Sequence, residues 1–240
     1  MKVDKAIKAT FNTNLIILNG FLVALLVGTI LLMLPVSSAS GNGTDFITAL
    51  FTATTSLCVT GLVVVPTYAY WSIFGKVIIL ILIQLGGLGI ISFTIGFLII
   101  IGKKISLKER KMIQESYNLD SAQGVLKILR KIFGITVKIE GIGAILYSIQ
   151  FIPEYGIVKG ICYSVFHSVS AFCNAGIDII GNDSFVKYHG NVLVNFTTVM
   201  LIICGGIGFI VWLDIGGIIS EIRNKKLRPN KFIERMKLHT

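Results

Sequence analysis

Charged residues are scarce in this sequence. Of its 240 residues, 14% are charged, whereas 54% are hydrophobic. Three stretches contain no charged residue: Leu15–Leu34, Val77–Ile101 and Val192–Leu213, of 20, 25 and 22 residues. Each is long enough to cross the ~30 Å hydrocarbon core of a bilayer as a helix. The scarcity of charge therefore excludes an ordinary soluble domain and predicts an all-α integral membrane protein in contact with lipid.

The residues that build catalytic and metal sites are also sparse. His167 and His189 have no carboxylate close by in sequence, and the nearby aspartates form no metal-ligand spacing. The four cysteines include no CxxC pair, which favours buried thiols used as small apolar side chains. We therefore expect neither an enzyme nor a cofactor, and we expect His167 to pack inside the protein.

Basic residues, by contrast, are concentrated in a few segments. With four spans, 18 of the 22 lysines and arginines fall on one side of the membrane. These segments include 102–124 and 221–240 as well as the residues before the first span. The positive-inside rule then predicts a multi-pass protein of the cytoplasmic membrane with both termini in the cytoplasm. The basic segments carry no nucleic-acid reader motif, so we expect no nucleic-acid partner.

The third span, Ile132–Ile152, contains two charged residues, Lys138 and Glu140. Charge inside a membrane is by default a sign of function. The alternative is structural, with Lys138 extending to the inner interface and Glu140 meeting a local partner. Residues two apart do not share a helix face, so the two should not pair with each other.

A short apolar run, Phe46–Leu57, is too short to cross a bilayer. At 12 residues it is typical of a buried or re-entrant helix. It is followed at once by a small-residue turn, Cys58-Val59-Thr60-Gly61-Leu62. A half-helix directs its partially negative C-terminal end at such a turn, and the carbonyls of the turn can replace the water around a cation. This order of elements indicates an ion-selectivity loop.

The same order recurs later in the chain. After an expected external turn, Pro153–Gly160, the run Ile161–Phe172 again has 12 uncharged residues, and Cys173-Asn174-Ala175-Gly176-Ile177 follows it. A shift of 115 residues superposes Cys58 on Cys173 and Gly61 on Gly176. The alternative for each glycine is a plain surface turn. Two breaks of this kind at matched positions instead suggest one shared pore, since irregular backbone at membrane depth must line a cavity or be buried in protein.

The two halves of the chain thus have one plan: span, half-helix, glycine turn, span. We predict a first pore repeat over residues 1–124, with spans 15–34 and 77–101, half-helix 46–57 and filter 58–62. A second pore repeat is predicted over residues 125–240, with spans 132–152 and 192–213, half-helix 161–172 and filter 173–177. Each final span contains a GGxG motif, Gly86–Gly89 and Gly205–Gly208, which we expect to allow close packing of helices.

At these residues the sequence resembles the Trk/Ktr/HKT superfamily of potassium uptake proteins. The resemblance rests on FTATTSLCVTGLVVV with QLGGLGI, and on FHSVSAFCNAGIDI with GGIGF, and it is nearest to the Ktr membrane subunit. Members have four such repeats around a single pore, and each repeat contributes one filter glycine. The resemblance implies that the ion ligands are the backbone carbonyls of eight residues: Cys58, Val59, Thr60, Gly61, Cys173, Asn174, Ala175 and Gly176.

The resemblance further implies potassium uptake driven by the membrane potential, with or without coupling to sodium. It implies a homodimer that binds a cytoplasmic nucleotide-binding regulatory subunit. Only two of the four repeats are present, so we expect an N-terminal half or a truncated product. Closing a pore then requires the missing C-terminal half or a second copy. The alternative is a non-conducting scaffold or assembly subunit, in which the re-entrant turns serve only packing.

Overall fold

The computed structural model describes residues 2–89, 125–181, 183–208, 211–212 and 215–216. Across these residues the chain is helical, and the only bridge of β type is an isolated one between Ser38 and Trp71. The elements, in order, are α1 (Lys2–Met33), η1 (Pro35–Ser37), α2 (Phe46–Leu57), α3 (Thr67–Tyr70), α4 (Ile73–Leu88), α7 (Val125–Tyr155), α8 (Ile157–Phe172), η2 (Ser184–Tyr188) and α9 (Val192–Gly206).

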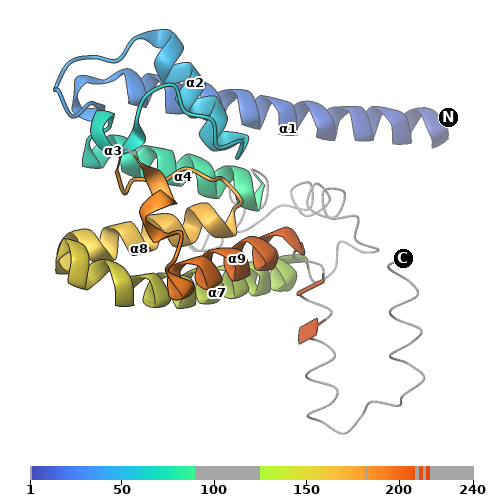
Figure 1. Ribbon diagram of the computed structural model, residues 1–240. Helices are drawn as coiled ribbons and strands as arrows, with labels where there is room; N and C mark the ends of the chain where they lie inside the picture. The colour runs from blue at the N-terminus through green and yellow to red at the C-terminus, as the bar shows by residue number, and fades with distance from the viewer. Residues whose placement is uncertain (1, 90–124, 182, 209–210, 213–214, 217–240) are drawn as a thin grey trace, which may run out of the picture.

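The first group of helices consists of α1, α2 and α4 (Figure 1). Helix α1 ends at Met33, and Pro35 then opens the short turn η1. Helix α2 begins where the sequence predicts because Asp45 caps it, accepting a hydrogen bond from the Thr48 N–H at 2.9 Å. That N–H lowers the pKa of Asp45 below its usual value, since it stabilises the carboxylate. The N-cap places the start of the first half-helix at Phe46.

The second group consists of α7, α8 and α9. Here the predicted external turn Pro153–Gly160 is wrong: α7 continues through Pro153 to Tyr155, and α8 begins at Ile157. Gly156, with φ 82°, makes the reversal in one residue. Gly160 packs so closely on Ile152 that a Cβ there would lie 2.6 Å from the Ile152 Cα. The second half-helix is therefore 16 residues long and not 12.

The two groups meet where α4 contacts α8 (Figure 1). One apolar core of buried side chains continues across both groups. Ile79 and Ile83 of α4 are fully buried in this core, as is Phe151 of α7. The contact brings the C-terminal ends of α4 and α8 close together. It thereby positions the loop that follows α8.

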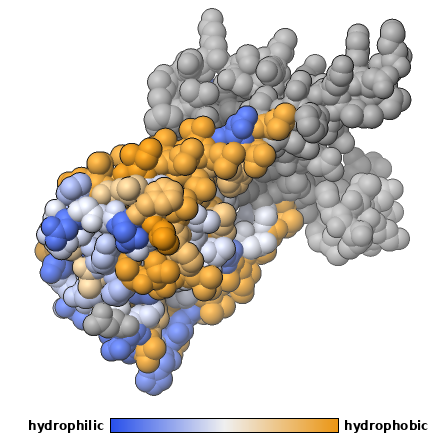
Figure 2. Space-filling model, turned by 90° about the horizontal axis from the view of Figure 1, so that it is seen from above, coloured by the Kyte–Doolittle hydropathy of each residue, from blue (hydrophilic) through white to orange (hydrophobic). Residues whose placement is uncertain are grey.

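On the face seen in Figure 2, apolar side chains extend along the described part of the molecule, and polar ones gather at one end. Large exposed apolar residues occur along three of the long helices: Val23 and Ile30 on α1, Val137 and Ile145 on α7, Phe196 and Val199 on α9. In the described part of the chain, one helical segment, Ile128–Tyr155, is long and apolar enough to cross a membrane. Exposed apolar area of this extent is typical of contact with lipid or another protein.

The predicted final spans are interrupted in the structure. Helix α4 begins at Ile73 and ends at Leu88, and α9 ends at Gly206. The last glycine of each GGxG motif has a left-handed φ, 79° at Gly89 and 88° at Gly208, which an uninterrupted helix does not allow. The rest of the predicted span 77–101, the loop 102–124 and the tail 221–240 lie outside the described residues.

Candidate functional site: the two half-helix loops

The first loop turns immediately at the end of α2. The Cys58 N–H still donates to the Thr54 carbonyl, and the Thr60 N–H folds back to the Thr55 carbonyl at 3.0 Å. Val59 and Gly61 both have positive φ, 56° and 78°. A β-branched residue such as Val59 rarely adopts this conformation, and such strain gathers at functional sites. The Thr55 hydroxyl accepts from the Leu62 N–H at 3.0 Å and so holds the far end of the turn.

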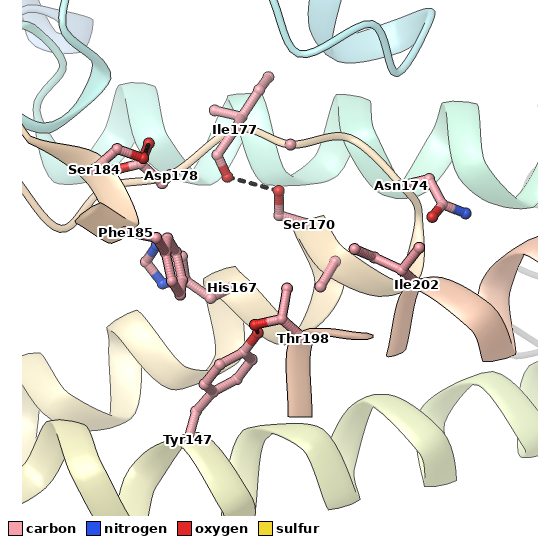
Figure 3. Close-up of a pocket in the computed structure, with 12 residues that line it drawn as sticks. Tyr147, His167, Ser170, Asn174, Ile177, Asp178, Ser184, Phe185, Thr198 and Ile202 are labelled. Carbon is pink, nitrogen blue, oxygen red and sulfur yellow. Dashed lines mark hydrogen bonds between the residues drawn. The ribbon is translucent and has the colours of Figure 1, made fainter. Parts of the chain in front are cut away.

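The second loop repeats this geometry at the positions given by the 115-residue shift. The Ala175 N–H donates to the Ser170 carbonyl at 2.8 Å, and Asn174 and Gly176 have φ values of 60° and 66°. The Ser170 hydroxyl donates to the Ile177 carbonyl at 2.6 Å (Figure 3). A hydroxyl of the half-helix therefore holds each loop, Thr55 in the first and Ser170 in the second.

The two loops lie against each other. A Cβ built on Gly61 would be 2.5 Å from the Ala175 carbonyl oxygen, so only glycine fits at this contact. Gly176 faces the Gly61 Cα at a looser distance. A cavity of about 460 Å³ opens beside both glycines, and Asp178 is the charged residue in its lining. The structure thus brings the eight predicted site residues together as two adjacent loops.

Each GGxG motif packs against the end of a half-helix. A Cβ on Gly86 would collide with the Leu57 carbonyl oxygen, and one on Gly205 with the Phe172 carbonyl oxygen. Leu57 and Phe172 are the last residues of α2 and α8. The predicted role in close packing is therefore correct, and the packing partner is the half-helix terminus that precedes each loop.

His167 lies behind the second loop, in a cavity of about 210 Å³ (Figure 3). Its Nε2 accepts a hydrogen bond from the Ile179 N–H at 3.2 Å, which makes Nδ1 the donor to the Tyr163 carbonyl at 2.6 Å. The ring is 2% exposed and contacts Phe185 edge-on, with centroids 5.0 Å apart. His167 thus packs inside the protein as predicted, and it holds the backbone just beyond the loop.

Glu140 has a partner that the sequence does not reveal. Gln84 of α4 donates from Nε2 to the Glu140 Oε1 at 2.9 Å, across the boundary between the two predicted repeats. The Cys173 thiol donates in turn to the Gln84 Oε1 at 3.8 Å. Lys138 is exposed, and among the described residues no ion pair joins it to Glu140. The expectation that these two residues do not pair is confirmed.

Sequence reasoning did not anticipate the left-handed backbone of Val59 and Asn174, nor the part played by the two hydroxyls on the half-helices. Val59 carries no sequence signal for a left-handed φ, whereas an asparagine such as Asn174 is enriched in this region and could have suggested it. Thr55 and Ser170 did superpose in the repeat, and a hydroxyl at the same place in both halves could have marked them as holding the loops.

The described part of the chain is all-helical, with apolar side chains exposed along its long helices, and two of its helices end at adjacent loops. The chain belongs to the TrkH family, described as cation transport proteins, whose sequence profile matches residues 2–240. This family confirms the membrane location and the resemblance seen in the sequence.

Three curated relatives illustrate the similarity. The chain is 44% identical to the potassium/sodium uptake protein NtpJ of Enterococcus hirae over 94% of this chain and 49% of the relative. It is 40% identical to the Ktr system potassium uptake protein B of Bacillus subtilis, over 90% and 48%. The Vibrio alginolyticus protein of the same name is 38% identical over 83% and 43%. The chain therefore spans about half the length of the curated relatives it matches. All these names describe transport and none an enzyme, as predicted.

Proposed function

We propose that the chain forms half of the pore of a potassium uptake transporter. Residues 1–124 and 125–240 are its first two pore repeats, and the carbonyls of Cys58–Gly61 and Cys173–Gly176 are cation ligands. The observation that carries this proposal is the pair of matched half-helix loops in contact at Gly61 and Ala175. Two half-helices whose C-terminal loops are in contact give a favourable site for a cation, because each C-terminus carries partial negative charge.

The transport step requires no bond chemistry. A single positive charge moving through 100 mV gains ~2.3 kcal/mol, so an inside-negative membrane potential is sufficient to drive uptake. One relative is named a potassium/sodium uptake protein, and sodium is accordingly the second ion to be tested, as a co-substrate or as a competitor. Carbonyl ligands in a loop held by hydroxyls of the half-helix favour a dehydrated monovalent cation.

The remaining wall of the pore comes from a complementary half, and closure by a second copy of this chain is the alternative that the test below distinguishes. The irregular backbone of both loops is otherwise open to lipid on one side, where each unsatisfied polar group costs several kcal/mol. We further propose that the complete transporter is a homodimer with both chain ends in the cytoplasm. With this topology, the basic segments 102–124 and 221–240 face the cytoplasm, where a nucleotide-binding regulatory subunit would bind. Both segments lie outside the described residues.

A bacterium that lacks its own potassium uptake systems tests the proposal. The chain is expressed alone and together with the complementary half of the Bacillus subtilis relative, and growth is measured over a series of low potassium concentrations. We expect growth only when both halves are present. Membrane fractions are blotted for the chain in every strain, so that absence of the protein is not mistaken for absence of transport.

The alternative, a non-conducting scaffold, predicts a different result. A scaffold reaches the membrane and associates with its partner half, but supports no growth at low potassium even when both are present. Growth with the chain alone would instead mean that two copies close a pore, and would contradict the need for a complementary half.

A further inference from the structure

A polar cluster crosses the boundary between the two repeats, and the transport mechanism proposed above does not use it. Its members are Gln84 on α4, Glu140 on α7 and Cys173, the first residue of the second loop. Gln84 donates to Glu140 at 2.9 Å and accepts from the Cys173 thiol at 3.8 Å. The Gln84 amide therefore links helix α7, through Glu140, to the start of the second loop, at Cys173.

The surroundings of the cluster leave little room for movement. A Cβ on Gly87, three residues after Gln84, would collide with the Cys173 side chain. The Ser168 hydroxyl donates to the Glu140 backbone carbonyl at 2.6 Å and so fixes α8 against α7. Glu140 and Gln84 are both half-buried among apolar helices, where a polar side chain without a partner is costly.

We propose that Gln84 and Glu140 are positioning residues, which hold the second loop in register with the first repeat. Glu140 orients the Gln84 amide, and the amide oxygen holds the Cys173 end of the loop. The carbonyls of Cys173–Gly176 then keep a set distance from those of Cys58–Gly61. Loss of the bridge lets the second loop shift relative to the first, and cation affinity and selectivity fall before the turnover rate does. This inference rests on the proposed transport function.

The test exchanges the two side chains in the assembly of this chain with its complementary half. Initial rates of rubidium uptake are measured over a range of rubidium concentrations, with rubidium as the tracer for potassium and with membrane content quantified by blotting. Glu140→Leu and Gln84→Leu are expected to raise KM about tenfold, the upper end of the effect of losing one ordinary hydrogen bond. The maximal rate per transporter in the membrane should change much less.

Two further variants separate positioning from general stability. Glu140→Gln keeps an acceptor oxygen and should recover most of the affinity lost in Glu140→Leu. Gln84→Glu alone places two carboxylates together and should impair affinity, whereas Gln84→Glu combined with Glu140→Gln restores an amide–carboxylate pair and should recover it. Lys138→Gln is the matched control, because Lys138 is exposed on the same helix.

The outcomes are distinct. An unchanged KM in both leucine variants, at normal membrane content, overturns the inference. So does a double exchange that is no better than Gln84→Glu alone, and this comparison decides the matter if a leucine variant does not reach the membrane. Absence of rubidium uptake in the unsubstituted assembly contradicts the proposed transport function itself.

Discussion

Four residues with left-handed backbone determine the shape of the two loops. Val59 and Asn174 occupy one matched position, Gly61 and Gly176 the other. Left-handed backbone costs a residue with a Cβ ~1–2 kcal/mol, and a β-branched valine is an uncommon choice for it. The first loop is therefore strained at Val59. The second loop is less strained at the matched position, because asparagine tolerates left-handed backbone better than valine does.

Gly61 and Gly176 should respond unequally to a methyl group. Changing either glycine to alanine should lower the free energy of unfolding by ~1–2 kcal/mol, because a residue with a Cβ is strained at a positive φ. Only Gly61→Ala also drives a Cβ to 2.5 Å from the Ala175 carbonyl oxygen, whereas a Cβ on Gly176 would come no closer than 3.9 Å to its nearest neighbour, the Gly61 Cα. We expect Gly61→Ala to lower the apparent melting temperature of the detergent-purified assembly well below that of Gly176→Ala.

Gly181→Ala is the control for this pair, since it has open space and no left-handed φ. Its melting temperature should match that of the unsubstituted protein. Equal destabilisation by Gly61→Ala and Gly176→Ala would mean that the two loops are not in contact as described.

The sequence predicted which residues form the loops but not how they differ. Gly61 and Gly176 were indicated by a short apolar run, a small-residue turn and the 115-residue repeat. Their unequal crowding depends on a contact between residues more than a hundred positions apart, which no local pattern encodes. The hydrogen bond between Gln84 and Glu140 joins residues 56 positions apart, and no local pattern encodes it either.

At the scale of elements, the C-terminal end of each half-helix packs against a glycine of the GGxG motif that follows it in the sequence. Gly86 lies on the last carbonyl of α2 and Gly205 on the last carbonyl of α8. The obstructing atoms are backbone, so a side-chain rotation cannot relieve the collision. Overpacking of this kind costs ~1–3 kcal/mol or more.

Gly86→Ala and Gly205→Ala are therefore expected to reduce the amount of folded protein in the membrane strongly. The measurement is the yield of monodisperse protein after detergent extraction. Gly141→Ala, at an open position in α7, supplies the matched control, and its yield should be normal because alanine is favoured over glycine in a helix by ~1 kcal/mol. Normal yield in both Gly86→Ala and Gly205→Ala would show that α4 and α9 do not pack on the half-helix ends.

Element boundaries were predicted where a local signal was strong. The start of α2 has an N-cap, and the observed helix has the predicted bounds. The start of α8 was placed four residues late because the prediction began with the uncharged run, after Lys159. In the structure Lys159 lies in the first turn of α8 and is exposed, so its charge does not prevent the helix from beginning at Ile157.

The helix ends inside the two GGxG motifs were not predicted. Both motifs were interpreted only as packing surfaces within continuous spans. The structure instead has left-handed backbone at Gly89 and Gly208, and glycine adopts it without the cost that a Cβ would bring. The sequence alone does not distinguish a glycine that allows close packing from one that also ends a helix.

At the scale of the whole molecule, the distribution of basic residues predicts the orientation. With 18 of 22 basic residues on one side, the loop containing Ser40 should face the exterior, and the segment 102–124 the cytoplasm. A cysteine at Ser40 should react with a membrane-impermeant thiol reagent added to intact cells. A cysteine at Ser121, outside the described residues, should react only after the cells are opened.

The native thiols need a control in this experiment. Cys58 and Cys162 are exposed in the structure, so the labelling is performed in a background where both are replaced by serine. Labelling of the Ser121 position in intact cells, with protection of the Ser40 position, would reverse the orientation and with it the direction of transport.

The central claim is that the two adjacent loops select the transported cation. Its most direct test is the ratio of potassium to sodium influx into proteoliposomes that contain this chain with its complementary half, at a fixed inside-negative potential. Gly176→Ser alters a loop carbonyl through its left-handed φ but has space for the side chain, so the assembly should remain folded. Gly190→Ser controls for the substitution itself, because Gly190 is exposed, has open space and has no left-handed φ. We predict that the potassium-to-sodium ratio falls in Gly176→Ser and is unchanged in Gly190→Ser. A ratio that is the same in both variants as in the unsubstituted assembly would contradict it.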